Sequence, residues 1–460
     1  MIRIFNHYIH RQTVLQLLFD ALLFVATVMG LLTLQLGHVE ALVPIASLHV
    51  LPLTAGMLVV GSASGMYQRA AHLTLVQSLA RAALMLLLAL PLVYIAFSFL
   101  PSDLPHRSAL QWATVGGLAA VILRRVYLMH WGVQATSRTR ILIFGAGPAA
   151  DLVAKTLKES DPQIEIVGFY AGPNEREATV AASKLLPGAR TLIDTAQHFD
   201  VDEIVVALTE RRAGSMPLRQ LLDCKLSGIK VYDLSTHFEK RLGQIRVDFV
   251  NAGWLIFGDG FNQDPLRATI KRFFDILFSL LLIVLATPIM LATALLIKLE
   301  SRGAVFYRQE RVGQNGSTFM VAKFRSMRSD AEKDGTPRWA SAQDDRVTRV
   351  GNIIRKVRID ELPQLFNVLK GEMSLVGPRP ERPFFVEQLT DQIPYFAARH
   401  SVKPGVTGWA QVRYAYGATV EDAQNKLQYD LYYVKNHSLF LDLVVLFETV
   451  GVVLTGKGAR

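Results

Sequence analysis

Residues 271–299 read KRFFDILFSLLLIVLATPIMLATALLIKL, an apolar run with basic residues at both ends. Since about 20 apolar residues suffice to cross a bilayer, length alone predicts a membrane-spanning helix. The basic residues that follow are Arg302, Arg308, Arg311, Lys323, Arg325 and Arg328. Such residues favour the cytoplasmic side of a membrane, and Pro288 removes a hydrogen bond in the middle of the run. We therefore expect a re-entrant membrane helix, broken at Thr287 and Pro288, that enters and leaves on one side.

Four more apolar stretches of span length open the sequence, at 14–34, 42–60, 82–100 and 109–128. Arginines flank this set at Arg3 and Arg11, at Arg69 and Arg81, and at Arg124 and Arg125. This distribution predicts a four-span α-helical bundle over residues 1–135 with both of its ends in the cytoplasm. Asp20 lies within the first stretch, where an unpaired charge is costly, so we expect it to face a neighbouring helix in a structural contact.

The composition indicates a membrane protein with a basic polar part. The chain has 460 residues, a formal net charge of +10 and a mean hydropathy of +0.27. A positive mean hydropathy with so many basic residues is not typical of a soluble protein, and no nucleic-acid recognition motif occurs. Membrane lipids and phosphorylated substrates are therefore the expected partners, and nucleic acid is not. The single cysteine, Cys224, excludes an intrachain disulfide framework.

Residues 136–262 have the pattern of a small doubly wound α/β domain of Rossmann-like type. Buried-strand candidates at 141–144, 164–169, 204–207 and 229–232 are separated by stretches of helical length. Gly145 and Gly147 follow the first strand, as in a CoA- or NAD-type nucleotide loop. However, the acidic residue expected after the second strand is missing from 168–170. The glycines serve either a tight strand-to-helix turn or a bound phosphate, and the turn is the favoured interpretation.

A cluster of charged residues further along the chain has the composition that phosphoryl transfer needs. It reads RKVRIDELPQ over 355–364 and GEMSLVGPRPER over 371–382. Asp360 is a candidate nucleophile and Glu361 a candidate Mg²⁺ ligand, because carboxylates form acyl phosphates and hold hard cations. The cations that could neutralise a diphosphate are Lys323, Arg355 and Arg379. By itself, the cluster is also compatible with a solvated helix start that carries ion pairs.

Residues 265–460 resemble the bacterial sugar transferase family, the monotopic polyprenyl-phosphate phosphoglycosyltransferases that start exopolysaccharide and O-antigen repeat units. The matching stretches are the helix with Pro288, KFRSM at 323–327, DRVTRVG at 345–351, 355–364, LVGPRPE at 375–381 and KPGVTGWAQ at 403–411. The resemblance implies a catalytic dyad in which Asp360 is the nucleophile and Glu361 holds Mg²⁺. The substrate-binding residues that it implies are Lys323, Arg325, Arg355, Arg379 and Pro380.

By the same resemblance, the chain transfers a sugar-1-phosphate from a UDP-sugar to undecaprenyl phosphate and releases UMP, through a covalent aspartyl-phosphosugar. Residues 263–460 would form a mainly α-helical catalytic domain, which the re-entrant helix holds on the cytoplasmic face of the bacterial inner membrane. Four spans followed by a Rossmann-like domain is the layout of the large members of the family. Glucose or galactose is the expected sugar, N-acetylated sugars stay open, and the bundle leaves surface for a homodimer.

Three other functions fit parts of the sequence. A membrane-anchored nucleotide-sugar dehydratase would need Tyr-x-x-x-Lys, and no tyrosine of this sequence has a lysine four positions on. A non-catalytic nucleotide-binding membrane scaffold leaves Asp360, Glu361 and Arg379 unexplained. A nucleic-acid-binding protein at the membrane surface would show salt-dependent affinity, but no motif supports it. The sequence therefore favours the transferase over these three functions.

Overall fold

The computed structural model describes residues 2–4, 7–9, 11–36, 49–67, 75–98, 107–130, 139–160, 164–172, 175, 179–188, 191–208, 216–250, 252–257, 259–261, 264–328, 346–414, 417 and 419–455. The chain divides into two compact units. The first comprises Met1–Gln68, Thr74–His130 and Gly253–Arg460, and the second comprises Arg69–Leu73 and Trp131–Ala252.

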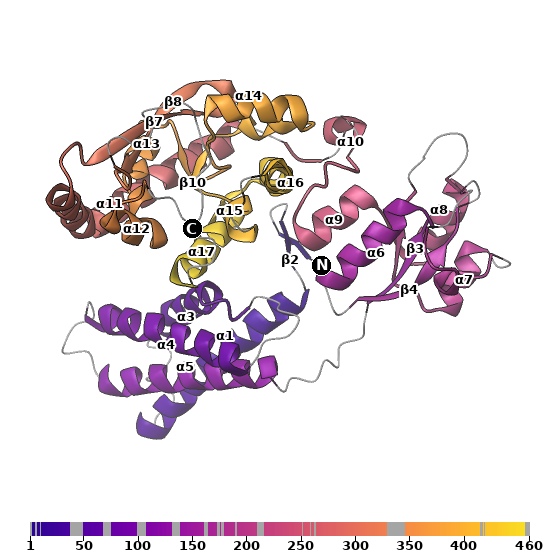
Figure 1. Cartoon of the computed structure of the whole chain (residues 1–460). Coiled ribbons are helices and arrows are strands. Elements are labelled where there is room, and N and C mark those ends of the chain that lie inside the picture. The colour runs from indigo at the N-terminus through magenta and orange to yellow at the C-terminus, as the bar shows by residue number, and fades with distance from the viewer. Residues whose placement is uncertain are drawn as a thin grey trace. The chain divides into compact units, whose positions relative to one another are not determined.

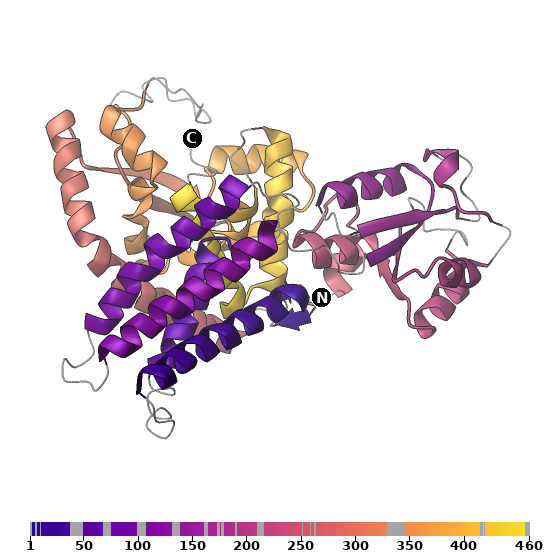
Figure 2. The same ribbon diagram turned by 90° about the horizontal axis from the view of Figure 1, so that it is seen from below.

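The first unit begins with a short hairpin, β1 (Ile2–Ile4) and β2 (His7–Ile9), followed by a group of apolar helices. These are α1 (Arg11–Leu36), α3 (Leu51–Ala63), α4 (Leu75–Ser98) and α5 (Arg107–His130). They pack side by side around buried apolar side chains that include Phe24, Val28 and Val121 (Figure 2). Since many outward leucines are exposed, the helices present apolar surface on their outer sides as well.

Asp20 on α1 meets the prediction made for it. Its carboxylate is fully buried and is paired with both Arg124 and Arg125 of α5. Gln16, one turn earlier on α1, accepts a hydrogen bond of 2.9 Å from Arg125, and the Arg125 guanidinium lies over the ring of Tyr67. The charge within the first apolar stretch is therefore a structural contact between helices α1 and α5.

Three helices of the described chain are long and apolar enough to cross a membrane, namely those over Thr13–Gln35, Ser78–Ser98 and Pro265–Glu300. The second predicted span falls on α3, which has 13 residues, and part of that stretch lies outside the described residues. The fourth falls on α5, which is long but contains polar and basic side chains. The described structure is thus mostly helical with three candidate spans, and the four-span bundle stays a prediction.

The second unit contains a four-stranded parallel sheet of order β4-β3-β5-β6. Its strands are β3 (Thr139–Phe144), β4 (Ile164–Tyr170), β5 (Glu203–Val206) and β6 (Lys230–Asp233). Its helices are α6 (Pro148–Ser160), η2 (Ala182–Lys184), α7 (Leu192–His198), α8 (Leu218–Leu226) and α9 (Leu234–Leu242). Side chains of α6 and α9 fill the core on one face, and those of α7 and α8 fill it on the other (Figure 1). This is the doubly wound arrangement that the spacing of the apolar runs predicts.

The C-terminal part of the first unit surrounds two small sheets with short helices (Figure 1). Its strands are the antiparallel pair β7 (Phe306–Val312) and β8 (Thr318–Phe324) and the parallel pair β9 (Ser374–Val376) and β10 (Gly405–Thr407). Its helices are α10 (Ala252–Phe257), α11 (Pro265–Glu300), η3 (Gln314–Gly316), α12 (Arg349–Lys356), η4 (Ile359–Glu361), α13 (Gln364–Lys370), α14 (Pro383–Gln392), η5 (Phe396–Ser401), α15 (Trp409–Arg413), α16 (Val420–Asn436) and α17 (Leu439–Thr455).

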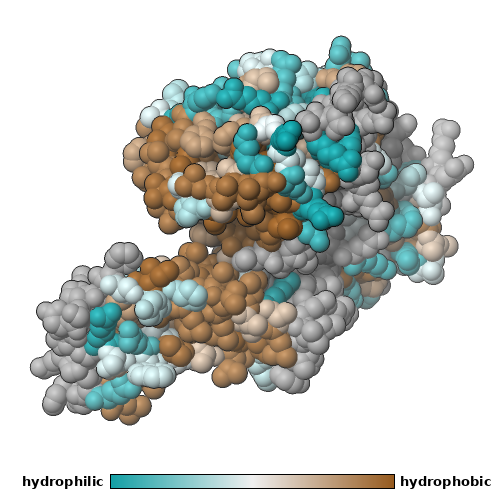
Figure 3. All heavy atoms as spheres, turned by 60° about the vertical axis from the view of Figure 1, so that its left-hand side comes forward, coloured by the Kyte–Doolittle hydropathy of each residue, from teal (hydrophilic) through white to brown (hydrophobic). Residues whose placement is uncertain are grey.

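Helix α11 continues through Thr287 and Pro288, so the expected break is not an interruption of the helix. A straight helix of its 36 residues would be about 54 Å long, well beyond the hydrocarbon core of a bilayer. Its outer side chains are apolar and exposed, among them Val284, Leu285 and Leu291. Figure 3 shows apolar side chains gathered over large areas of the face turned forward in that view. The re-entrant course of this helix stays a prediction.

Candidate active site

Asp360 and Glu361 lie on η4, the single turn that joins α12 to α13. The side chain of Thr348 accepts a hydrogen bond from the N–H of Gly351 and so begins α12. Arg358 then adopts a left-handed backbone with φ of 60°, a conformation that non-glycine residues rarely take. This turn brings both carboxylates into the interior, where Asp360 is 8% and Glu361 7% exposed.

The two ends of α11 hold the two helices that flank this turn. At the end of α11, the Glu300 carboxylate accepts hydrogen bonds from the backbone N–H groups of Arg349 and Val350, and so occupies the N-terminus of α12. Near its start, Arg272 donates to the carbonyl oxygens of Val368 and Leu369 at the end of α13, at 2.5 and 2.6 Å. The apolar helix therefore fixes the frame in which the two carboxylates sit.

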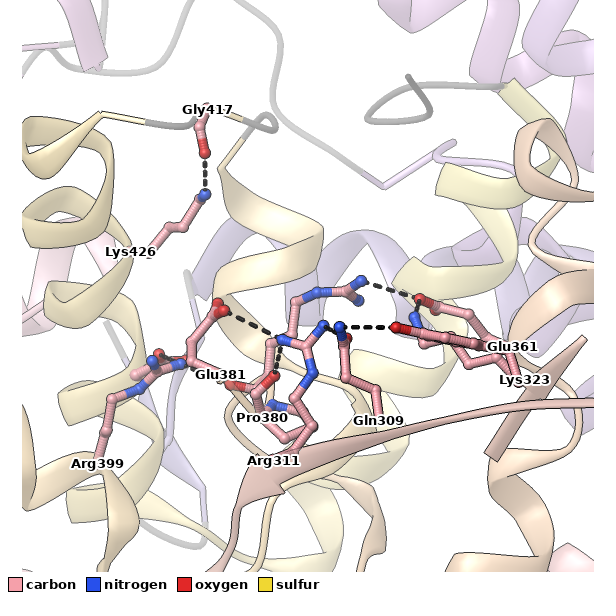
Figure 4. A network of polar contacts seen from close by, with 12 residues as sticks. Gln309, Arg311, Lys323, Glu361, Pro380, Glu381, Arg399, Gly417 and Lys426 are labelled. Atoms are coloured by element: carbon pink, nitrogen blue, oxygen red, sulfur yellow. Dashed lines mark hydrogen bonds and ion pairs between the residues drawn. The ribbon is translucent and has the colours of Figure 1, made fainter. Parts of the chain in front are cut away.

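Three cationic side chains surround the Glu361 carboxylate. Oε1 of Glu361 accepts hydrogen bonds from Lys323 Nζ at 2.8 Å and from Arg379 Nη2 at 2.9 Å, and Oε2 lies 3.8 Å from Arg358 Nη1. Figure 4 shows Lys323 and Glu361 pointing toward one another. Burial alone would raise the pKa of Glu361, but these three cations outweigh it and hold the pKa well below its ordinary value. Glu361 is therefore ionised at neutral pH.

Asp360 has a different environment from its neighbour. Its Oδ1 is buried and has no hydrogen-bond partner among the residues that the structure describes. Burial and the negative charge of Glu361 raise the pKa of Asp360 to about 6, although Lys323, Arg358 and Arg379 act in the opposite direction. A carboxylate with an unsatisfied oxygen and a raised pKa is more basic, and hence more nucleophilic, than an ordinary aspartate.

Arg379 is delivered by a loop that crosses another backbone at very short range. The N–H of Gly377 donates to Thr407 O at 2.9 Å, and the N–H of Gly405 donates to Pro378 O at 2.9 Å. A Cβ at Gly377 would collide with the carbonyl oxygen of Lys403. Glycine is therefore required at this crossing, which joins the two motifs over 375–381 and 403–411. Pro378 and Pro380, on either side of Arg379, restrict the backbone further.

The structure does not bring all of the predicted site residues together. Arg325 is buried, and its guanidinium donates to the carbonyl oxygens of Ser301 and Arg302, so it closes the end of α11 instead of facing Glu361. Arg355 stands in the last turn of α12, and its side chain makes no hydrogen bond or ion pair with any residue that the structure describes. Thr287 and Pro288 lie inside α11, where Thr287 donates to the carbonyl of Ile283.

Two basic residues near Glu361 and Arg379 were missing from the predicted site. Arg358 faces Glu361, and its position two residues before Asp360 was the available signal. Arg311 on β7 donates to Pro380 O at 3.1 Å and lies 3.5 Å from Glu381, so it supports the Arg379 loop (Figure 4). In the sequence, Arg311 stands out only as part of a basic run, because no neighbouring residue links it to a loop 69 positions away.

The carboxylates of Asp360 and Glu361 are suited to a magnesium ion whose remaining ligands are substrate phosphates and water. Among the described residues, Asp360 Oδ1 has no hydrogen-bond partner and the hydrogen bonds to the Glu361 side chain go to Oε1, so each residue offers a hard oxygen ligand. No cluster of three or more histidine, cysteine or carboxylate side chains suited to a metal occurs among the described residues. Mg²⁺ is commonly held by one or two carboxylates together with substrate phosphates and water, which is what this donor set would allow.

The glycine turn of the second unit is already occupied by a side chain of the same chain. Oε2 of Glu175 accepts hydrogen bonds from the N–H groups of Ala146 and Gly172, at 2.7 and 2.9 Å. Gly145 has a φ of 131°, and a Cβ there would lie 2.8 Å from Ala207 O. The tight turn accounts for the glycine, and the carboxylate lies where a phosphate of a nucleotide would contact the amides.

Two stretches of the chain match known families. Residues 266–456 match the family described as bacterial sugar transferase, and residues 62–217 match the family described as CoA-binding domain.

Three relatives are similar over most of the chain. A protein of Aeromonas hydrophila named UDP-N-acetylgalactosamine-undecaprenyl-phosphate N-acetylgalactosaminephosphotransferase is 46% identical over 56% of this chain and 60% of its own length. A protein of Xanthomonas campestris pv. campestris named UDP-glucose:undecaprenyl-phosphate glucose-1-phosphate transferase is 31% identical over 75% of this chain and 73% of its own length. A protein of Klebsiella pneumoniae with the same name is 34% identical over 68% of this chain and 67% of its own length.

Proposed function

We propose a reaction for this chain from the premise that it belongs to the bacterial sugar transferase family. The chain transfers a sugar-1-phosphate from a UDP-sugar to undecaprenyl phosphate and releases UMP, as the first step of exopolysaccharide or O-antigen assembly. The observation that carries the proposal is the buried pair of carboxylates, in which Glu361 is held by three cations while Asp360 beside it keeps an unpartnered oxygen.

In the first half of the reaction, Asp360 is the nucleophile. A carboxylate oxygen of Asp360 attacks the β-phosphorus of the UDP-sugar, and the bond between that phosphorus and the oxygen bridging to the α-phosphate breaks. UMP leaves with the bridging oxygen, and the sugar phosphate stays on Asp360 as an acyl phosphate. Lys323, Arg358 and Arg379 contact the phosphate oxygens as charge develops there. Mg²⁺, held by Glu361, would neutralise part of the same charge.

In the second half, the phosphate of undecaprenyl phosphate attacks the same phosphorus and releases Asp360. A covalent intermediate suits this pair of substrates, because the aqueous donor and the lipid acceptor need not be bound at the same time. Arg355, at the end of α12 and without a partner in the described chain, is available for one of the substrate phosphates. The product is a polyprenyl diphosphate sugar.

Membrane attachment follows from the same assignment. Helix α11 would enter the cytoplasmic leaflet of the inner membrane, bend near Thr287 and Pro288, and return, which keeps its basic flanks on one side. Both of its ends contact helices of the C-terminal part, which supports a returning course. The domains would then be a four-span bundle over 1–135, a Rossmann-like domain over 136–262 and a catalytic domain over 263–460.

The donor sugar is a hexose in this proposal, and glucose and N-acetylgalactosamine, which the relatives' names mention, are the first to test. The experiment measures UMP release by the purified chain from a panel of UDP-sugars, with and without Mg²⁺ and undecaprenyl phosphate. Sustained turnover with one sugar, dependent on the lipid and on Mg²⁺, is the expected result. If no donor gives UMP under any of these conditions, the proposed reaction is wrong.

A further inference from the structure

A second buried ion pair lies behind the Arg379 loop, outside the proposed dyad. Arg399 on η5 is 5% exposed and Asp430 on α16 is 1% exposed, and Nη2 of Arg399 lies 2.7 Å from Oδ2 of Asp430. Removing two charges from water is costly, so a buried pair is weak evidence for stability by itself. The role of the Arg399–Asp430 pair therefore depends on the groups that it contacts.

The same nitrogen of Arg399 also reaches the backbone of the site. Nη2 donates to the carbonyl oxygen of Arg379 at 2.9 Å and also forms the ion pair with Asp430. The side chain of Arg379 in turn donates to Glu361 at 2.9 Å. A chain of charged contacts therefore leads from the interior of α16 through Arg399 to the carboxylates.

The opposite side of the loop is held in a similar way. Arg311 on β7 donates to the carbonyl oxygen of Pro380 at 3.1 Å, and the N–H of Val312 donates to Glu381 O at 2.9 Å. Figure 4 shows Arg311 and Arg399 flanking Pro380 and Glu381 from different elements. Beside its crossing with Gly405 and Thr407, the loop is thus held by β7 on one side and by Arg399 on the other.

We propose that Asp430 and Arg399 are positioning residues of the transferase site. Asp430 orients the Arg399 guanidinium, Arg399 holds the carbonyl of Arg379, and Arg379 is thereby aimed at the phosphate groups of the nucleotide sugar. This inference rests on the proposed function, in which Arg379 contacts the donor. A shift of about 1 Å in a group that contacts the reacting atoms can cost on the order of 10²-fold in rate.

A double-mutant cycle between Asp430 and Arg379 tests this relation in the full chain. Asp430→Asn keeps the size of the side chain and removes its charge, so kcat/KM for the UDP-sugar should fall about 10²-fold. Because Asp430 acts through Arg379, the same substitution in an Arg379→Ala background should change kcat/KM less than about threefold. A similar loss in both backgrounds would mean that Asp430 only supports the fold, and would overturn the proposal.

A second variant and a matched control keep the cycle interpretable. Arg399→Lys keeps the positive charge opposite Asp430 but replaces the rigid, planar guanidinium that places Nη2 between Asp430 and the carbonyl of Arg379, so it should reproduce the loss and its dependence on Arg379. Glu203→Gln removes the carboxylate of another buried ion pair, with Arg241 at 3.0 Å in the second unit, and should leave kcat/KM unchanged. A loss as large in Glu203→Gln as in Asp430→Asn would contradict the proposal.

Equilibrium binding separates this inference from the proposed reaction. Titration calorimetry with UDP and Mg²⁺ on the same variants should show weaker binding in Asp430→Asn and no further weakening once Arg379 is absent. If the wild-type chain releases no UMP from any donor but the binding cycle shows this coupling, the proposed reaction fails and the positioning role stands. If turnover is normal and the cycle is additive in both measurements, the positioning role fails alone.

Discussion

Two regions of this chain hold a carboxylate at a point where a phosphate would fit, and they hold it by different means. At the turn after β3, backbone N–H groups of Ala146 and Gly172 bind Glu175. At the dyad, flexible side chains bind Glu361 instead, with Lys323 and Arg379 at hydrogen-bond distance. Backbone amides are fixed by the fold, whereas lysine and arginine side chains can turn from one anion to another.

The neighbours of the two carboxylates differ as well. Glu175 lies beside a glycine turn, where its carboxylate accepts hydrogen bonds from backbone N–H groups. Glu361 adjoins Asp360, a buried carboxyl with an unpartnered oxygen. A phosphate-binding sequence pattern can thus be closed by the chain itself, while a cluster that resembles surface ion pairs can be buried.

The largest effect is expected when the proposed nucleophile is removed. Asp360→Asn keeps the volume of the side chain but cannot form the acyl phosphate, so lipid-dependent UMP release should fall by at least about 10⁴-fold. Glu175→Gln should keep wild-type turnover in the same assay. Near-normal turnover in Asp360→Asn, with the membrane fraction of both variants equal to that of the wild type, would remove the distinction between the two regions.

A smaller loss is expected at Arg358, the cation that reaches Glu361 from within its own turn. Arg358→Met removes the charge, and loss of one group that stabilises transition-state charge costs roughly 10²- to 10³-fold in kcat. The matched control is Lys356→Met, because Lys356 is an exposed basic residue two positions earlier. Equal kcat values for the two variants would show that Arg358 serves only the shape of the turn.

Several features of the fold and of the site are predictable from the sequence, because their signals lie in residues close together in the chain. The four strands and the intervening helices of the second unit follow from the spacing of apolar runs, and Asp20 follows from the cost of a charge in an apolar helix. Asp360 and Glu361 stand in a dense motif in which their chemistry is visible. Patterns of this kind depend on near neighbours in the chain.

The remaining features depend on tertiary contacts that neighbouring residues do not encode. Lys323 and Arg325 belong to one motif, yet Lys323 lies within β8 and faces Glu361, whereas Arg325 lies beyond the strand and closes α11. The left-handed backbone of Arg358 runs against its intrinsic preference and is imposed by packing. Glu175 reaches Ala146 across 29 positions with no periodic pattern between them.

The pH dependence should also distinguish the dyad. Since Asp360 must be ionised to attack and its pKa is raised to about 6, kcat/KM should reach a plateau above that pH and fall about tenfold per unit below it. Arg358 lowers the pKa of Asp360, so the acid limb of Arg358→Met should move to higher pH. A profile that is flat from pH 5 to 8 would show that Asp360 is not the group whose ionisation limits the reaction.

The smallest expected effect is a change in amide hydrogen exchange at the glycine turn when Glu175 is substituted. It decides whether this turn is closed to a ligand. Two hydrogen bonds from backbone amides to a carboxylate contribute about 1.5–3 kcal/mol each at most when well buried, and Glu175 is only partly buried. Glu175→Gln keeps an acceptor oxygen and should increase amide hydrogen exchange at Ala146 and Gly172 only a few-fold. Glu175→Ala leaves both N–H groups without their acceptor and should increase it more.

Adding CoA or NAD to the wild-type chain tests the same turn. Because Glu175 already satisfies these amides, their exchange rates should stay unchanged. A nucleotide that bound here would have to displace the carboxylate and would slow exchange across 145–150. Protection of that segment by a nucleotide in the wild-type chain would show that Glu175 gives way to a ligand, and the two regions would then differ in affinity instead of in kind.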